Sequence, residues 1–267
     1  MTVSSTHLVL LPSFNTGPKL TAVVTEVLRQ GWPVLVVIDG SDDGSEQPLL
    51  ALEKTEPSLT VRSLPKNSGK GAAVLAGAHY ALARGFTHAL VMDSDGQHPA
   101  ASISPFMEIS REHPNALVLG KPLFPSNIPI ERLYGRKLSN GLVWVELLGT
   151  GVKDTLFGFR VYPLFSLVAT LAPRRTGRRY DFDTEAAVRM AWSGVLPLNV
   201  AAPVRYFSQA EGGVSHYRYV RDNLRMISMH ANLLVELVFR RWPALLRHRR
   251  LWKANPAWLR FNRCTSS

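Results

Sequence analysis

Val91-Met92-Asp93-Ser94-Asp95-Gly96-Gln97-His98 is the stretch on which the interpretation of this chain depends. It follows an apolar run, residues 87–92, that is typical of a buried β-strand, and it closes that run with two carboxylates. Because residues i and i+2 of a strand point the same way, we expect Asp93 and Asp95 to converge on one hard cation. Oxygen ligands of this kind suit Mg²⁺ or Mn²⁺ together with the phosphates of a nucleotide diphosphate. A solvated Asp-Ser-Asp-Gly turn is the competing interpretation of this stretch taken alone.

The length and composition bound the fold class. A chain of 267 residues with 46% hydrophobic side chains fits one large α/β domain with an appendage, or two small domains, and is not disordered. The single Cys264 excludes an intrachain disulfide and a zinc–thiolate site and favours a reducing compartment. The first seven residues lack the pattern of a secretion signal, so we do not expect export.

The net charge of +11 is concentrated near the C-terminus. Residues 218–267 contain eleven Lys and Arg against Asp222 and Glu236, a net charge of +9, and the rest of the chain carries only +2. We therefore expect a nearly neutral globular domain over residues 1–216 and a basic tail over residues 217–267.

The first half of the chain alternates strand-like and helix-like segments. Strands are expected at residues 7–11, 33–38, 59–64 and 87–92, and helices at 18–29, at 49–54 and from the 66–71 loop to about 84. The second half is expected to contain strands at 116–119, 161–162 and 196–206 and helices at 130–148 and 183–192. This order predicts an α/β fold with a mostly parallel central sheet flanked by helices. Four strands then end in polar loops at the edge where such sheets bind ligands.

Two of those loops carry further chemistry. The 39–45 loop places Asp39 directly at a strand end, where it can bind a nucleobase or a ribose hydroxyl, although the loop taken alone is better explained as an Asp/Gly turn. The Asn67-Ser68-Gly69-Lys70-Gly71 loop offers free N–H groups at a helix start and a lysine, all of which favour phosphate; a plain helix cap is the alternative. It matches neither of the common Gly-rich nucleotide motifs.

The four loops in their order resemble those of the inverting family 2 glycosyltransferases of GT-A fold, in the branch of polyprenyl-phosphate (dolichyl-phosphate) mannose or glucose synthases. The resemblance covers roughly residues 7–220. Its first half rests on four loops, Pro12-Ser13-Phe14-Asn15, Val37 to Gly44, Asn67 to Gly71 and Met92 to Pro99. Its second half rests on Asp154 with Gly158-Phe159-Arg160, on Phe182-Asp183-Thr184-Glu185 and on Gly213-Val214-Ser215.

The resemblance implies a role for each matching residue. It implies a nucleotide-sugar pocket lined by Pro12, Phe14, Asn15 and Asp39, with Lys70 approaching the donor, and a Mg²⁺ or Mn²⁺ site of Asp93, Asp95 and Gln97. Arg132 or Arg136 would meet phosphate groups, and Asp154 and Arg160 would flank the acceptor. Two departures concern the donor and acceptor: Thr16-Gly17 replaces an acidic residue common in the first loop, and His216 replaces the lysine that usually follows Gly-x-Ser.

The expected reaction is a single displacement at the anomeric carbon of the donor. The cation on Asp93 and Asp95, with Lys70 and Arg136, would stabilise the charge that builds on the departing diphosphate. A lipid phosphate acceptor is already anionic, whereas a hydroxyl acceptor needs a general base. Asp183 is the first candidate for that base and Glu185 the second; both also suit a helix N-terminus.

The basic tail mixes apolar and charged positions at helical spacing. Residues 226–239 are too few and too polar to span a bilayer, so an amphipathic helix on the membrane surface is expected, with Trp242, Trp252 and Trp258 near the headgroups. Packing on the catalytic domain is the alternative, and no nucleic-acid-binding motif is present.

The sequence therefore predicts a membrane-associated enzyme at the cytoplasmic face that moves a sugar from a nucleotide-sugar to a lipid-linked acceptor. One alternative is transfer to a hydroxyl of a non-polyprenyl lipid. A second is a sugar-phosphate nucleotidyltransferase, although residues 12–17 lack the Gly-rich basic signature expected after its first strand. The third alternative is a non-catalytic basic binding module, but the presence of four phosphate-type loops in such a module would be a coincidence.

Overall fold

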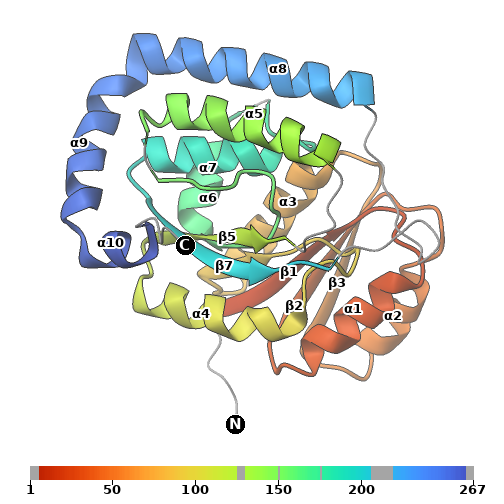
Figure 1. Cartoon of the computed structure of the whole chain (residues 1–267). Coiled ribbons are helices and arrows are strands. Elements are labelled where there is room, and N and C mark those ends of the chain that lie inside the picture. Colours follow the sequence, from red (N-terminus) through yellow and green to blue (C-terminus); the bar gives the residue numbers. More distant parts are fainter. Residues whose placement is uncertain (1–5, 125–129, 150, 175, 206–218, 263–267) are drawn as a thin grey trace.

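One sheet organises the part of the chain that this computed structural model describes, residues 6–124, 130–149, 151–174, 176–205 and 219–262. Its seven strands, counted over those residues, lie in the order β3-β2-β1-β4-β6-β5-β7. Figure 1 shows the sheet with helices on both sides of it. The strands are β1 (His7–Ser13), β2 (Val34–Asp39), β3 (Leu59–Leu64), β4 (His88–Val91), β5 (Ala116–Leu123), β6 (Arg160–Pro163) and β7 (Leu196–Pro203). Only β6 among them runs antiparallel to its neighbours, which confirms the predicted mostly parallel sheet.

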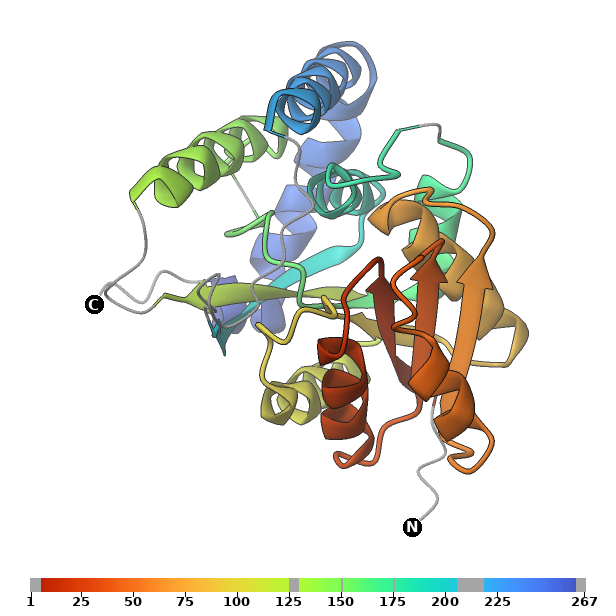
Figure 2. The ribbon, with the colours of Figure 1, turned by 90° about the vertical axis from the view of Figure 1, so that its right-hand side faces the viewer.

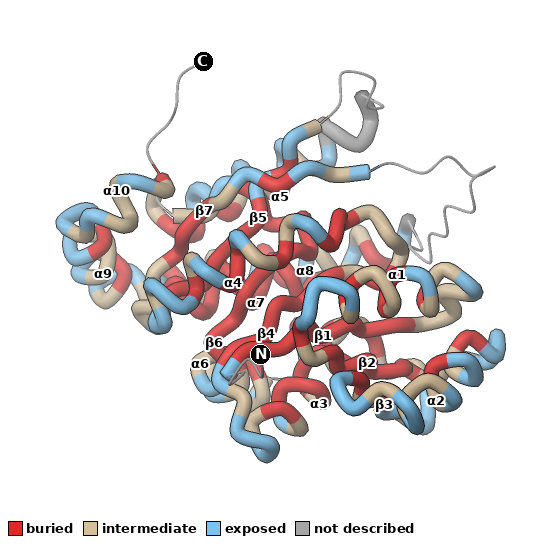
Figure 3. The backbone as a smooth tube through the Cα atoms, turned by 90° about the horizontal axis from the view of Figure 1, so that it is seen from below, coloured by how far each residue is buried: buried red, intermediate tan, exposed pale blue. Residues whose placement is uncertain are grey.

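Helices cover both faces of the sheet. The core on one face contains side chains of α1 (Lys19–Leu28), α2 (Gln47–Glu53) and α4 (Ile103–Glu112), which follows the short 3₁₀ turn η1 (Ala100–Ser102). The core on the other face contains α3 (Lys70–Ala83), α6 (Leu164–Leu171) and α7 (Phe182–Trp192). Consecutive strand residues enter opposite cores, as for Leu10 and Leu11, because side chains alternate along a strand. Figure 3 shows the resulting pattern, with buried strands beneath helices whose outer turns are exposed.

Most of the expected elements are present with shifted ends. The strand that precedes the acidic pair is shorter than expected, because β4 ends at Val91. Helices α4 and α6 were not expected from the sequence. The sequence of α6, Leu164–Leu171, is almost entirely apolar, so it carries little of the polar–apolar alternation that marks a helix.

The basic tail forms helices that pack on the rest of the molecule. They are α8 (Tyr219–Glu236), the π-helical turn η3 (Leu237–Arg241), α9 (Trp242–Ala254) and α10 (Pro256–Asn262). Helix α8 lies beside α5 (Ile130–Glu146) above the sheet (Figure 2), and α9 and α10 contact α7 and β7. Met229, Leu233 and Trp252 enter a third core together with Trp192.

The expectation for the tail tryptophans was wrong for two of the three. Trp252 is buried and Trp258 is partly buried against the third core, so neither is placed to meet headgroups, whereas Trp242 is exposed. In the described residues, no helix has the length and apolar character needed to cross a bilayer.

Candidate active site

The predicted loops meet at one edge of the sheet. The parallel strands β1, β2, β3 and β4 end there, and the antiparallel β6 begins there, since Arg160 pairs with Val91 at the end of β4. The segment that precedes β6, including Asp154, therefore reaches the same edge as the acidic pair. The antiparallel direction of β6 thus brings residues from the second half of the chain to the same edge as the loops from the first half.

The acidic pair lies in a turn and not on a strand. Because β4 ends at Val91, the strand alternation that we used to predict the convergence of Asp93 and Asp95 does not apply. The two carboxylates are nevertheless close enough to interact: burial and the neighbouring Asp93 raise the pKa of Asp95. Asp95 Oδ1 accepts a hydrogen bond from the backbone N–H of Gln97 at 3.0 Å, which fixes the turn.

Lys70 is held between two carboxylates. Its Nζ lies 2.6 Å from Asp93 Oδ1 and 2.6 Å from Asp183 Oδ2. Burial alone disfavours the ammonium, but the charges of Asp183 and Asp93 outweigh it and raise the pKa of Lys70. The same contact lowers the pKa of Asp93 against the effect of its burial. The lysine is therefore a fixed positive charge beside the acidic turn.

The donor set of this site suits a divalent cation. Asp93, Asp95 and Asp183 bring three negative charges and Lys70 one positive charge, so these four groups carry a net charge of −2, which a divalent cation balances. No group of three or more His, Cys, Asp and Glu able to hold a metal occurs in the described part of the chain. Mg²⁺ and Mn²⁺ in proteins are often bound by one or two carboxylates and take their other ligands from substrate and water.

Asp39 has a role that the sequence did not suggest. It is buried, and its two oxygens accept hydrogen bonds from the backbone N–H groups of Ser68 at 2.8 Å and Gly69 at 2.7 Å. The carboxylate thus caps the start of α3 from another loop and sets the position of Lys70. The predicted contact with a nucleoside would require this enclosed carboxylate to accept one more hydrogen bond.

The first loop is positioned by polar contacts. The Asn15 amide donates to Asp42 Oδ1 at 2.7 Å, and the Asn15 backbone N–H donates to Ser41 Oγ at 3.1 Å, so this loop is joined to the loop after β2. Phe14 is half-buried beside it, whereas Pro12 is buried within β1, where it pairs with Val37. Phe14 and Asn15 can reach a ligand at this edge; Pro12 supports them from inside the sheet.

Arg136 and Asp154 form an ion pair near this edge. Arg136 Nη1 lies 2.6 Å from both Asp154 oxygens, and Asp154 Oδ1 also accepts the N–H groups of Leu156 and Phe157. The side chain of Arg132, the other basic candidate, lies outside the described residues, as do Gly213-Val214-Ser215 and His216.

The resemblance implied that Arg160 flanks the acceptor, but the structure does not place it there. It is completely buried, and it donates to the carbonyl oxygens of Thr155, Phe157 and Asp183. It therefore fixes the backbone at Asp183.

The two candidate bases are both engaged. Asp183 pairs with Lys70, and Glu185 Oε1 accepts from Arg189 Nε at 2.5 Å and from Thr176 Oγ1 at 2.7 Å. Glu185 is 1% exposed, and these two partners, Arg189 and Thr176, do not belong to the acidic turn. As expected from their spacing on the helix, only Asp183 reaches the site.

Sequence reasoning missed three contacts at the acidic turn. His98 Nε2 lies 3.5 Å from Asp93 Oδ2, and the Thr16 hydroxyl lies 3.0 Å from that of Ser94, which ties the first loop to the turn. Gly158 lies against both charges: a Cβ there would be 2.5 Å from Asp93 Oδ2 and 2.7 Å from Lys70 Nζ. The run from Gly158 to Arg160 was quoted for its resemblance, but only the fold shows why a glycine is needed.

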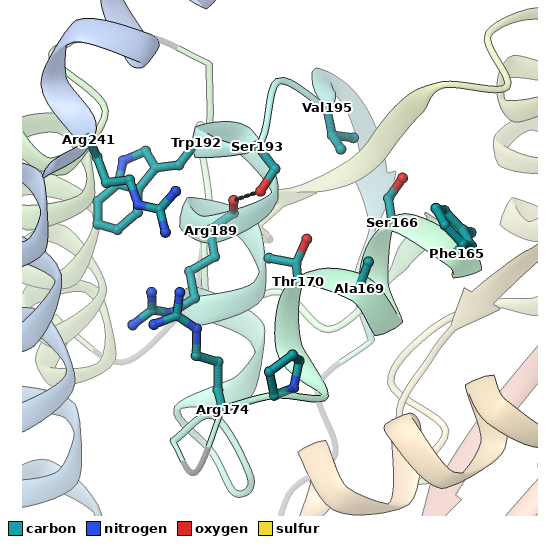
Figure 4. Close-up of a pocket in the computed structure, with 11 residues that line it drawn as sticks. Phe165, Ser166, Ala169, Thr170, Arg174, Arg189, Trp192, Ser193, Val195 and Arg241 are labelled. Carbon is teal, nitrogen blue, oxygen red and sulfur yellow. Dashed lines mark hydrogen bonds between the residues drawn. The ribbon is translucent and has the colours of Figure 1, made fainter.

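A cavity of about 510 Å³ lies elsewhere, between α6, α7 and the tail (Figure 4). Arg174, Arg189 and Arg241 line it and share the carboxylate of Glu236, with N···O distances of 3.4, 2.6 and 2.7 Å. These contacts and the buried Trp192 fasten the tail to α7, and the cavity lies at this junction. None of the predicted site residues lines it.

Comparisons with known proteins show which family the chain is similar to. The family model described as glycosyl transferase family 2 matches residues 8–144. Polyprenol monophosphomannose synthase of Mycolicibacterium smegmatis is 32% identical over 216 residues, which cover 78% of this chain and 79% of that protein. Undecaprenyl-phosphate mannosyltransferase of Micrococcus luteus is 28% identical over 193 residues, which cover 70% of this chain and 78% of that protein.

Among solved structures, a mannosyltransferase of Pyrobaculum calidifontis in complex with GDP-Man and Mn²⁺ superposes with a TM-score of 0.59. The match covers 95% of this chain and 75% of that chain at 16% identity. At this identity the likeness establishes the fold alone, and it confirms the predicted GT-A type.

Proposed function

The chain belongs to glycosyl transferase family 2 and is a glycosyltransferase, and we propose that it moves a sugar from a nucleotide-sugar donor to a lipid-linked phosphate. The observation that carries the choice of acceptor is that neither candidate base is accessible: Asp183 is paired with Lys70 through one oxygen and its other oxygen is buried, and Glu185 is buried against Arg189. A hydroxyl acceptor must lose a proton to a base, whereas a phosphate acceptor attacks as an anion. The relatives named for polyprenyl-phosphate substrates support the same choice.

The donor side of the reaction depends on charge. Asp93 and Asp95, with the Gln97 amide, would hold Mg²⁺ or Mn²⁺, which when bound supplies Lewis-acid stabilisation to the leaving diphosphate. Lys70 adds a positive charge at the start of α3, beside the acidic turn. Phe14 and Asn15 would orient the nucleoside. Charges that are already in place when the diphosphate departs need no reorganisation in the transition state.

The acceptor side depends on Arg136. Its Nη1 is fixed by Asp154, so its remaining N–H groups can point to an acceptor phosphate, and the side chain is 20% exposed. Arginine binds phosphate oxygens through paired N–H groups. Arg136 would therefore place the nucleophilic oxygen without removing its charge.

The tail has the features of a membrane-surface element. Helix α8 buries one apolar face and exposes a second one, which we call the α8 stripe. The stripe runs from α8 through η3 to the first residue of α9, and it consists of Val220, Leu224, Ile227, Ala231, Val235, Val238 and Trp242, which recur at helical spacing. Leu138 and Trp144 of the neighbouring α5 are also exposed. Basic residues flank the stripe, so the surface suits an anionic leaflet, and we propose peripheral attachment at the cytoplasmic face.

A transfer assay tests this function. The full chain would be incubated with radiolabelled GDP-mannose or UDP-glucose, Mn²⁺, and vesicles that contain either undecaprenyl phosphate or undecaprenol. We expect label in the lipid phosphate and none in the alcohol. Transfer to the alcohol alone would establish the hydroxyl-acceptor alternative. Formation of a nucleotide-sugar from a sugar 1-phosphate and a nucleoside triphosphate would establish a nucleotidyltransferase.

A further inference from the structure

Lys70 occupies the position of a cation beside the acidic turn. Its Nζ contacts Asp93 Oδ1 and Asp183 Oδ2 at the same distance, 2.6 Å, and its side chain is only 15% exposed. Asp93, which the proposed function assigns to the metal, is 36% exposed and open to an incoming ion. The ammonium and a divalent cation would therefore compete for one carboxylate oxygen.

The lysine is held there by rigid surroundings. Asp39 fixes the backbone N–H of Gly69, the residue before it, and Gly69 itself has a φ of +100°, a conformation that favours glycine. Arg160 fixes the backbone carbonyl of Asp183. Gly158 leaves no room on the third side, because a Cβ there would meet both Lys70 Nζ and Asp93 Oδ2. The ammonium can consequently move only between the two carboxylates and the open side of the site.

Asp183 can retain the lysine when Asp93 releases it. Its Oδ2 binds Lys70, but its Oδ1 is buried and has no hydrogen-bond partner in the described part of the chain. A buried carboxylate oxygen without a partner is costly, so it is ready to accept a donor. An ammonium carries three donors and can serve both oxygens of Asp183.

We propose that Lys70 is a built-in counter-ion that holds Asp93 until the divalent cation binds, and that Asp183 is the positioning residue that keeps Lys70 at the site afterwards. The displaced ammonium then faces the side from which the diphosphate enters. Asp183 thus acts through Lys70 and not as a base. This inference uses the metal site of the proposed function, but it does not depend on which sugar or lipid is used.

Mn²⁺ binding without donor or lipid tests the proposal, measured by the electron paramagnetic resonance signal of free Mn²⁺. Lys70→Met removes the charge at similar length, and we expect the variant to bind Mn²⁺ about tenfold more tightly than the wild type. Asp183→Asn leaves Lys70 with Asp93 as its only charged partner, so we expect weaker Mn²⁺ binding. The two variants should therefore change the affinity in opposite directions.

Lys66→Met is the matched control, because Lys66 is an exposed lysine of the same loop. A tightening as large as that of Lys70→Met would mean a general charge effect and would overturn the proposal. Unchanged or weaker Mn²⁺ binding by Lys70→Met would also overturn the proposal, as would tighter Mn²⁺ binding by Asp183→Asn. If one variant fails to fold, as judged by circular dichroism, the sign of the other still decides.

Adding GDP or UDP separates this proposal from the function it uses. In the wild type the nucleotide offers the displaced ammonium a second partner, so it should strengthen Mn²⁺ binding by a larger factor than in Lys70→Met. Equal factors would remove the role of Lys70 while leaving the metal site in place. Absence of Mn²⁺ binding in every variant, with and without nucleotide, would remove the metal site itself.

Discussion

Asp39 and Gly69 are 30 positions apart and are joined by a hydrogen bond of 2.7 Å from the Gly69 N–H to Asp39 Oδ2. This bond connects the end of β2 to the first turn of α3, and therefore to Lys70. Asp39, which the sequence suggested as a ligand contact, is thus part of the framework that positions Lys70.

Asp39→Asn should weaken this framework. An amide in place of the carboxylate sets its NH₂ group against one of the two backbone N–H groups, so we expect the free energy of unfolding to fall by about 1–3 kcal/mol. The variant should also bind nucleoside diphosphate more weakly. Urea denaturation and nucleotide titration measure the two effects. Glu56→Gln is the control, since Glu56 accepts a backbone N–H at the surface, and a loss as large there would contradict this role of Asp39.

Asp95→Asn should abolish most metal-dependent transfer. The variant keeps the size of the side chain but loses a charge from the cation site, and we expect kcat to fall by about 100-fold or more. Chelation of the wild type should give a similar loss that Mn²⁺ reverses. Full metal-dependent turnover by Asp95→Asn would exclude the assignment of Asp95 as a ligand.

Arg136→Ala should impair use of the lipid acceptor more than use of the donor. Loss of the paired N–H donors should lower kcat/KM for the lipid phosphate by about 10- to 100-fold, while donor KM stays nearly unchanged. Arg136→Lys should recover little, because an ammonium lacks the planar fork. Lys137→Ala, at the exposed neighbouring position, is the control. A change confined to donor KM would place Arg136 on the donor side instead.

Polar substitution of the α8 stripe should release the protein from vesicles. Leu224 and Ile227 are 60% and 64% exposed, and replacing both with serine should weaken binding to anionic vesicles by about tenfold. Binding of the wild type should also fall with added salt. Phe165→Ser is the control, because Phe165 is equally apolar and exposed but lies on α6. Equal losses from both variants, measured by co-sedimentation, would argue against a specific docking face.

Glu236→Gln should loosen the junction between the tail and α7. Three arginines contact this carboxylate, and despite its partial burial they lower the pKa of Glu236 to about 2 from an ordinary 4.5. We expect the free energy of unfolding at pH 7 to fall by about 2–3 kcal/mol.

The pH dependence of Glu236→Gln has a defined sign. A carboxylate with a lowered pKa stabilises the fold above its unfolded pKa, and this contribution is lost as the pH falls from about 4.5 to about 2. The difference between wild type and variant should therefore shrink over that window in denaturation experiments. Glu112→Gln, at an exposed side chain, should show no such window. A constant difference down to low pH would contradict the assigned cause.

The alternation of strands and helices in the first half could be predicted because each element there has a clear period and ends in a turn. β3 was predicted with both its ends. Helix α6 was missed because it is apolar on nearly all sides. At the site, local patterns identified Lys70 and Asp93 as candidates. Their link to Asp183, 113 positions from Lys70, could not be foreseen, because only the packing of α7 against α3 creates it.

The single antiparallel strand has an evolutionary consequence. Because β6 begins where β4 ends, loops before residue 100 supply most of the proposed donor side, and Arg136 and Asp154 supply the proposed acceptor side. Under the proposed function, drift in one half of the gene can therefore alter the preference for one substrate, while the Lys70–Asp183 contact couples the two halves. Recombination between paralogues near residue 115 would exchange acceptor preference as a block, provided that the Lys70–Asp183 contact across the two blocks is retained.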